Sequence, residues 1–268
     1  METYRIKRII IIILALVNAV LLLLLASKQM QTRKQQQEEF YQLKQLYERN
    51  GIALRISSLT DTAAPASALV RQNGEAEETF ISALLGENRI KEESGSTTDY
   101  TTPDGSTARL RRNGALEVRF RTPRLNYENT AAALQPFGYR LSPVTGSTES
   151  CTAVQYRDGC PLLGAALSLH FEDGLLSYLN GYYVHSIQES SEMLTLSDAD
   201  ALTLFLRYTQ TQGIVCGGID SISQAWLFSS STLFQSSLVP VLLISTDTAQ
   251  YYVNCEAQEI APIVDPLS

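Results

Sequence analysis

An uninterrupted apolar segment near the N-terminus constrains this chain more than any other feature. Residues 9–26 contain no charged residue, and Asn18 is their single polar residue. At about 1.5 Å rise per residue, such a helix spans roughly 27 Å, close to the hydrocarbon thickness of a bilayer. A soluble helix of this length normally carries a polar stripe. The segment therefore predicts a transmembrane helix over residues 9–26, with residues 1–8 as a cytoplasmic tail.

A cleaved signal peptide is the main alternative for this segment. Its apolar core is usually about 7–15 residues long and ends at a cleavage site of small residues. Here the run is longer, and Leu24 stands where the first small residue of such a site belongs. We therefore expect an uncleaved single-pass anchor in the cell membrane. A short basic tail before a long C-terminal region is the usual layout of such an anchor, so we expect residues 27–268 on the extracytoplasmic side.

Within the predicted span, Ala15, Asn18 and Ala19 share one helical face. Small residues let a second helix approach closely, and a membrane-buried amide seeks a hydrogen-bonding partner, an interaction worth about 0.6–2 kcal/mol. This face therefore predicts a packing site for another membrane protein. A polar residue whose amide bonds to its own helix is an equally good interpretation.

The charge of the chain lies outside this segment. The whole chain has 21 basic and 28 acidic residues, a net charge of −7. The first 26 residues hold three basic residues and one acidic residue, so the remainder has 18 basic and 27 acidic residues, net −9. Because phosphate contacts need clustered cations, a nucleic-acid partner is not expected.

Residues 27–50 predict a juxtamembrane stalk helix that continues from the membrane. They contain no Pro or Gly and are rich in helix-forming residues, and Gly51 supplies a stop signal. A narrow apolar stripe runs along this helix through Phe40, Leu43, Leu46 and Tyr47. We expect this stripe to dock on the protein's own folded body, with a partner helix as the alternative.

The rest of the chain predicts an α+β fold in which helices pack on antiparallel strands. We expect a first α+β module over residues 51–124 and a second α+β region over residues 125–268. Helices are expected near residues 76–85, 128–137 and 198–211, and about three strands follow each of them. Residues 57–67 are rich in Ser, Thr, Ala and Pro and predict a loop.

One hairpin allows its register to be predicted. A two-residue turn at Asn113 and Gly114 would mix charged and apolar residues on one face of the sheet. A three-residue loop over residues 112–114 pairs Leu110 with Leu116 and Arg109 with Glu117, so the two faces separate. We therefore expect the three-residue loop, with Gly114 in the left-handed conformation.

The same hairpin concentrates arginine in an acidic body. Six guanidinium groups fall within sixteen residues, of which four are candidate partner-binding residues: Arg109, Arg111, Arg119 and Arg121. Because Arg binds carboxylate and phosphate in bidentate fashion, these residues predict a docking patch for an acidic protein surface or an anionic polymer. The alternative, which the pattern favours, is a solvated outer face partly neutralised by Glu117.

Four cysteines remain, and an extracytoplasmic location permits their oxidation. Candidate disulfides join Cys151 to Cys160 and Cys216 to Cys255, and buried free thiols are at least as consistent with the sequence.

No motif indicates catalysis or a cofactor. His170 and His185 lack metal-ligand spacing and are expected on strand surfaces, and no Gly-x-Ser-x-Gly, Cys-x-x-Cys or phosphate-loop pattern occurs. We therefore expect a non-enzymatic protein without a cofactor or a metal.

Several stretches resemble the YycI group of membrane-anchored regulators. They include residues 155–163 (QYRDGCPLL), the strand at 167–169, the return at 175–178, and the pair 238–241 (LVPV) and 251–254 (YYVN). The short tail with Arg5 and Lys7 before an apolar helix containing Asn is also similar. Family members often carry Trp after the Pro-Val pair, and Leu242 stands there in this chain.

This resemblance implies an extracytoplasmic regulator of a two-component sensor histidine kinase that controls cell-wall metabolism. It implies PepSY-like modules in the folded part, and two protein partners, the kinase and a YycH-like sister protein. Contacts between transmembrane helices and with the lipid bilayer are part of the same expectation. The alternative is a PepSY-like envelope binding module that restrains a peptidase or senses a ligand derived from the wall.

Overall fold

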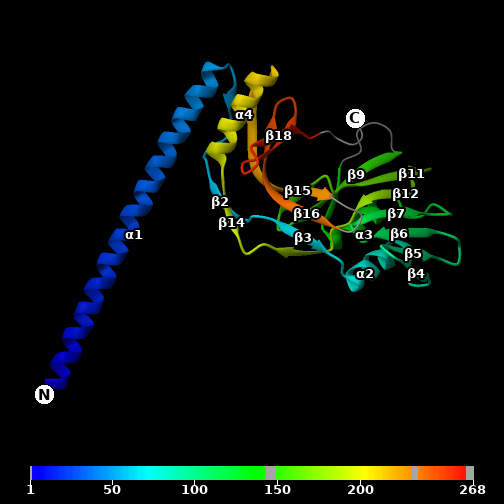
Figure 1. Cartoon of the computed structure of the whole chain (residues 1–268), viewed down its shortest axis with the longest axis horizontal. Helices are drawn as coiled ribbons and strands as arrows, with labels where there is room; N and C mark the ends of the chain where they lie inside the picture. The colour runs from blue at the N-terminus through cyan, green and yellow to red at the C-terminus, as the bar shows by residue number, and fades with distance from the viewer. Residues whose placement is uncertain (1, 143–148, 231–234, 264–268) are drawn as a thin grey trace.

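The structure is a computed structural model that describes residues 2–142, 149–230 and 235–263. In the N-terminal helix α1 (Glu2–Arg49), the side chains of residues 2–15, 19, 25, 26, 28–33 and 35 are not described. Figure 1 shows α1 as a long rod that projects from a folded body. Among the described residues, no helix is long and apolar enough to cross a membrane.

The folded body has two lobes. The terminal lobe (residues 40–71 and 186–263) is built from both ends of the chain, and the inserted lobe (residues 73–184) lies between them in sequence. Each lobe has a large core of its own, which includes Tyr47 and Val253 in the terminal lobe and Phe80 and Tyr183 in the inserted lobe. A smaller cluster that includes Leu162 and Trp226 contains side chains of both lobes. In Figure 1 the inserted lobe lies at the side of the terminal lobe that faces away from α1.

The terminal lobe consists of helix α4 on one face of a group of strands. α4 (Asp198–Gln212) begins at the N-cap Ser197, whose hydroxyl accepts a hydrogen bond from the Asp200 N–H, and ends at Gly213 with a positive φ of 66°. Its strands are β1 (Ala53–Leu54), β3 (Ala68–Arg71), β13 (Ser186–Glu189), β15 (Gly218–Ser230), β16 (Ser236–Thr246), β17 (Gln250–Asn254) and β18 (Glu259–Pro262). A separate pair contains β2 (Asp61–Pro65) and β14 (Met193–Ser197).

The inserted lobe packs two short helices on a second group of strands. α2 (Gly74–Leu85) and α3 (Tyr127–Leu134), which continues into the 3-10 helix η1 (Gln135–Phe137), contribute apolar side chains to its core. The strands are β4 (Ile90–Ser94), β5 (Thr97–Thr101), β6 (Thr107–Arg111), β7 (Ala115–Arg119), β8 (Tyr139–Leu141), β9 (Ser150–Arg157), β10 (Cys160–Leu163), β11 (Leu167–Glu172) and β12 (Leu175–Tyr182).

One mixed sheet joins the two lobes. Its main path runs β13-β3-β16-β15-β10-β9-β11-β12-β7-β6-β5-β4, and β10 pairs with β15 in parallel. The chain enters the inserted lobe after β3 and leaves it before β13, and these two strands pair with each other. The hairpin loop at Asn113 also connects the two lobes. The Asn113 side chain donates a hydrogen bond to the Ser230 hydroxyl at 3.2 Å, and the Asn113 carbonyl accepts one from the Ser236 hydroxyl at 2.9 Å.

Several expectations are confirmed. The fold is α+β, and α2, α3 with η1, and α4 lie where three helices were predicted. The register of the hairpin is also confirmed, because Leu110 pairs with Leu116 and Arg109 with Glu117. Gly114 has a positive φ of 87°, as the bulged loop requires.

Other expectations need correction. The boundary predicted between residues 124 and 125 cuts through one core, because β7 pairs with β12 and Val118 lies opposite Leu179. The predicted loop over residues 57–67 contains β2, which pairs with β14. The sheet is mixed rather than wholly antiparallel, since β1 and β10 both run parallel to β15.

Candidate functional site

The junction of α1 with the terminal lobe is the first candidate site. Tyr47, near the end of α1, is completely buried, and its hydroxyl donates a hydrogen bond of 2.7 Å to the carbonyl oxygen of Leu202 in α4. Burial raises the pKa of Tyr47, so the hydroxyl remains a donor. Leu43 and Phe40 pack against the same core, one and two turns before Tyr47 respectively. The predicted stripe therefore docks on the protein's own body, except for Leu46, which is exposed.

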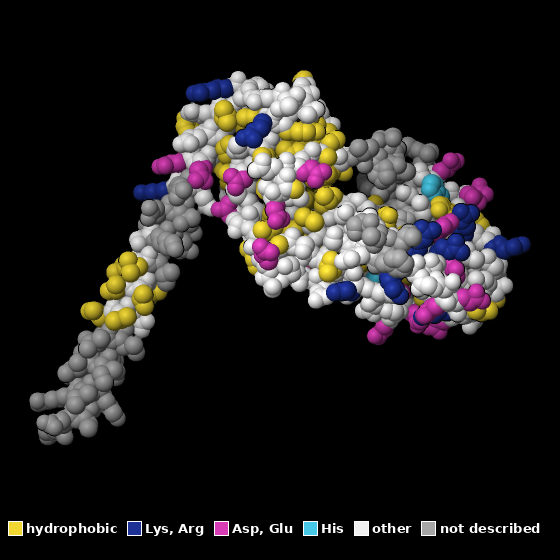
Figure 2. Space-filling view, in the orientation of Figure 1, with side chains coloured by type: hydrophobic (Ala, Val, Ile, Leu, Met, Phe, Trp, Pro, Cys, Tyr) yellow, Lys and Arg dark blue, Asp and Glu magenta, His cyan; other side chains and the backbone are white. Residues whose placement is uncertain are grey.

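The described apolar side chains in the first half of α1 do not touch the body. They are exposed from Leu16 to Leu24, with Leu22 at 67%, and Figure 2 shows them along the projecting rod. Asn18 is also exposed. The side chains of Ala15 and Ala19, the other members of the predicted packing face, lie outside the described residues. A stretch of leucines this exposed on a rod needs an apolar environment or partner.

The arginine-rich hairpin lies on the open face of the inserted-lobe sheet. Arg109 in β6 contacts Asp99 in β5 at 2.7 Å, and Arg119 in β7 contacts Glu117 at 2.8 Å. Hydrogen bonds from these guanidinium groups to the carboxylates raise the pKa of each guanidinium. Figure 2 shows the resulting mixture of basic and acidic side chains over this lobe. Two of the four predicted arginines are therefore neutralised locally.

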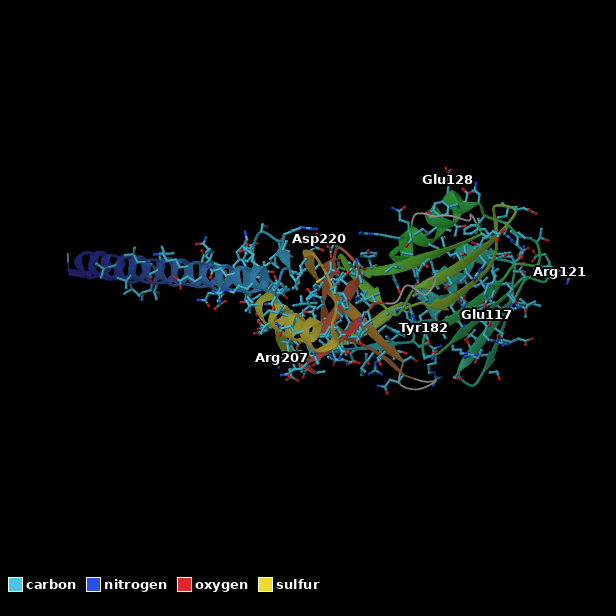
Figure 3. The ribbon with its side chains drawn as sticks, turned by 90° about the horizontal axis from the view of Figure 1, so that it is seen from above. Glu117, Arg121, Glu128, Tyr182, Arg207 and Asp220 are labelled. Atoms are coloured by element: carbon cyan, nitrogen blue, oxygen red, sulfur yellow. The ribbon has the colours of Figure 1, made fainter. Side chains whose placement is uncertain are left out.

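The other two arginines differ in position. Arg111 lies on the same face as Arg109 and has no ion pair among the described residues. Arg121 follows the end of β7, and Figure 3 shows it at the outer end of the lobe, apart from Glu117. The four arginines thus do not form one patch.

A shallow hollow of about 240 Å³ lies on this face beside Arg111. Tyr178, Asn180 and Tyr182 of β12 line it together with Arg109, Arg111 and Glu117. The Arg119 guanidinium lies 5.1 Å from the centre of the Tyr178 ring, within range of a cation–π interaction. The geometry favours a solvated polar face over a strongly basic docking patch.

All four cysteines are free thiols in the structure, so the candidate disulfides are not formed. Cys151 lies opposite Leu169, whereas Cys160 lies opposite Arg157 at the far end of β9. Six residues of strand separate those positions, about 20 Å, which is far beyond disulfide reach. Burial raises the pKa of Cys151 and of Cys255 to about 11.

A buried ionisable pair was missed from the sequence. His185 is buried rather than on a strand surface, and its Nε2 lies 3.1 Å from Oε1 of the buried Glu77. The N–H of Asn73 donates to the same nitrogen at 2.7 Å, and Nδ1 has no partner among the described residues. Asn73 precedes α2 and His185 precedes β13, so this contact links the two segments in which the chain passes from one lobe to the other.

The sequence carries a signal for only one member of that pair. Glu77 stands three and four positions before Phe80 and Ile81, which places it on the buried face of α2. His185 has no comparable pattern around it. The second histidine, His170, is exposed on β11 as expected. Within the described part of the chain, no three His, Cys, Asp or Glu side chains form a group that could hold a metal.

Comparisons with known proteins find similarity of structure but not of sequence. No family model matches the chain, and no curated protein matches it. An uncharacterized protein from Eubacterium rectale has a TM-score of 0.43 and 9% identity, covering 76% of this chain and 81% of its own. The Bacillus megaterium YpeB C-terminal domain has a TM-score of 0.37 and 10% identity, covering 72% of this chain and 98% of its own. Similarity at this level does not assign the chain to a family.

Proposed function

We propose that this chain is a membrane-anchored, non-enzymatic regulator of YycI type. Residues 9–26 would span the cell membrane, with the N-terminus in the cytoplasm and the folded body outside. The partners would be a sensor histidine kinase that controls cell-wall metabolism and a YycH-like sister protein. The two lobes of the folded body would be PepSY-like modules.

The attachment of α1 to the body carries this proposal. One continuous helix contains both the apolar residues 9–26 and the buried Tyr47. Tyr47 and Phe40 fix the end of the helix against α4 and the core of the terminal lobe. A freely jointed anchor would instead have a Gly- or Ser-rich linker between the apolar segment and the body. Because residues 27–49 are helical without a break, a movement of the span would also move the terminal lobe.

This coupling suggests how regulation would work. A partner that binds the span and the body in different relative positions in its two signalling states would be biased toward the state that fits the rigid unit. Such a bias needs only differential contacts and no chemistry.

Co-purification from membranes tests the proposal. The full chain is expressed with the candidate kinase, and binding and kinase activity are compared with a version whose residues 9–26 are all Leu. We expect the poly-Leu version to reach the membrane and to lose binding or regulation. A version with the single substitution Asn18→Leu, which removes the polar residue of the predicted packing face, is compared in the same way.

Two results would contradict the proposal. One is localisation of the intact chain away from the membrane. The other is full retention of binding and regulation by the poly-Leu version, which would assign the activity to the body alone. That second result would favour a PepSY-like envelope binding module.

A further inference from the structure

Strand β15 has an unpaired stretch in the middle of one edge. One of its two edges pairs with β16 from Ile219 to Ser230. On the opposite edge, β1 pairs with Gly218 and Ile219, and β10 pairs with Trp226 and Leu227. Residues 220–225, which lie between them, have no strand partner on this side among the described residues.

The physical consequence is a short row of unpaired backbone groups. N–H and C=O groups on a sheet edge are a template for another strand. At about 3.3 Å per residue, six residues present roughly 20 Å of such an edge. The strands β1 and β10 limit the stretch at both ends, so an added segment of about five or six residues fits it.

Most of this edge lacks the features that usually prevent strand addition; the exception is its first residue, the charged Asp220, where β15 also has a bulge against β16. Natural edges are protected by charges, by Pro or by a covering element. The outer strand β4 has Lys91, Glu92 and Glu93, and the outer strand β18 has Glu259 and Pro262. By contrast, residues 221–224 of β15 are Ser, Ile, Ser and Gln, all of them neutral.

A cavity of about 370 Å³ lies against the first half of this edge. Ser57, Ser58 and Ser221 line it together with Ile56 and Ile222, so it offers hydroxyl groups and two apolar side chains. Its charged groups already have partners. Arg55 contacts Asp220 at 2.6 Å, and Asp198 accepts hydrogen bonds from the N–H and hydroxyl of Thr60, both at 2.8 Å.

We propose that residues 220–225 of β15 bind an extended peptide segment of a partner protein by strand addition. The edge already accepts two strands of this chain, and both run parallel to β15, so the added segment continues an existing arrangement. Main-chain hydrogen bonds supply the affinity, and the cavity, whose charged groups already have partners, selects small or polar side chains through its hydroxyl groups. Figure 3 shows Asp220, at one end of this edge, on the terminal lobe. The proposal does not depend on the function proposed above.

A displayed library of random 12-residue peptides, selected on the full chain in detergent micelles, tests this inference. Selected peptides should slow hydrogen exchange of the amides at residues 220–225. N-methylation of alternate peptide residues should lower affinity at least 10-fold, because those N–H groups face β15, whereas methylation of the intervening residues should have little effect.

A matched pair of variants completes the test. Ser223→Lys places a charge on the proposed edge, and Ser94→Lys makes the same change on the exposed outer strand β4. Only Ser223→Lys should weaken peptide binding, again by at least 10-fold.

Several results would overturn the proposal. They are the absence of any peptide that protects this stretch, indifference to the position of N-methylation, and equal loss in both variants. Protection without peptide would also overturn it. If such protection persists on dilution, the chain's own residues cover the edge, and if it increases with protein concentration, a second copy does.

Discussion

The two lobes of the body contain similar elements but are held together differently. The inserted lobe forms its core from one contiguous stretch of chain, and successive hairpins build most of its sheet. The terminal lobe forms its core from the two ends of the chain, and its first strand lies beside a strand 165 residues later. The lobe that holds α1 therefore depends on pairing between the two ends of the chain, whereas the inserted lobe completes its pairing, including that of β7 with β12, within residues 73–184. We therefore expect the two larger cores to open separately, although a smaller apolar cluster that includes Leu162 and Trp226 joins the lobes.

The largest expected effect comes from removing the centre of the inserted-lobe core. Phe80 is completely buried and stacks on Tyr183 with ring centres 4.1 Å apart. Phe80→Ala should destabilise the inserted lobe by about 3–5 kcal/mol. Hydrogen exchange should show faster opening of the inserted lobe, with the core of the terminal lobe unchanged.

Val215→Ala is the control for this substitution, because Val215 is 87% exposed, and it should change stability by less than about 0.5 kcal/mol. If Phe80→Ala opens both lobes together, they form one cooperative unit and the comparison fails.

Substitutions at two glycines distinguish the cost of a positive φ from the cost of a close backbone contact. Gly114 and Gly174 have φ of 87° and 77°, so Ala at either position costs about 1–2 kcal/mol. At Gly114 alone, a Cβ atom would lie 2.9 Å from the carbonyl oxygen of Tyr183. Gly114→Ala should therefore lose about 1–3 kcal/mol more than Gly174→Ala in denaturant unfolding. Equal losses would contradict the close approach.

A smaller effect is expected where α1 meets the terminal lobe. Tyr47→Phe keeps the ring but removes the hydrogen bond to Leu202, which should cost about 0.5–1.5 kcal/mol. The loss should appear in the terminal lobe and leave the inserted lobe unchanged in hydrogen exchange. Tyr41→Phe, at an exposed position of the same helix, should have no measurable effect. A loss of similar size from both substitutions would show that Tyr47 has no special role.

The smallest effect is a pH dependence confined to the inserted lobe. A hydrogen bond from the Thr102 hydroxyl, helped by Ser106 and Arg124, lowers the pKa of the Asp104 carboxyl from 3.8 to about 2. The folded state therefore favours the carboxylate. Its stabilising contribution is complete above the unfolded pKa near 4 and is lost as the pH falls toward 2.

Carbon-detected NMR of the carboxyl groups measures this directly. Asp104 should titrate near pH 2, and Asp104→Asn should flatten the acid dependence of stability for the inserted lobe only. A midpoint near pH 4 would contradict the hydrogen-bonded turn.

The same contrast between lobes explains what could be predicted from the sequence. The hairpin at residues 107–119 was predicted with its register, because Gly114 and the alternation of Leu110 and Arg109 are local signals. The pairing of β1 with β15 has no local signal, since neither strand carries information about a partner 165 residues away. The pairing of β7 with β12 also joins distant parts of the sequence, and for this reason the boundary predicted at residue 124 was wrong although most nearby elements were right.

The candidate sites divide in a similar way. Docking of the stalk stripe was predicted, because Phe40, Leu43 and Tyr47 follow a helical period. Local neutralisation of the arginines was only partly predicted, because the pairing of Arg109 with Asp99 depends on a neighbouring strand. The contact of His185 with Glu77 joins residues that are far apart in sequence, and no spacing rule links them.

The central claim is that α1 and the terminal lobe move as one body. Spin labels at Gln42 on α1 and Arg207 on α4, both exposed, allow the distance to be measured by electron paramagnetic resonance on the full chain in lipid nanodiscs. Figure 3 shows Arg207 on the outer side of α4. We expect a single narrow distance distribution in the intact protein, and a broad one after Tyr47→Ala. A broad distribution in the intact protein would contradict the claim, because a loosely attached helix cannot transmit movement from the membrane to the body.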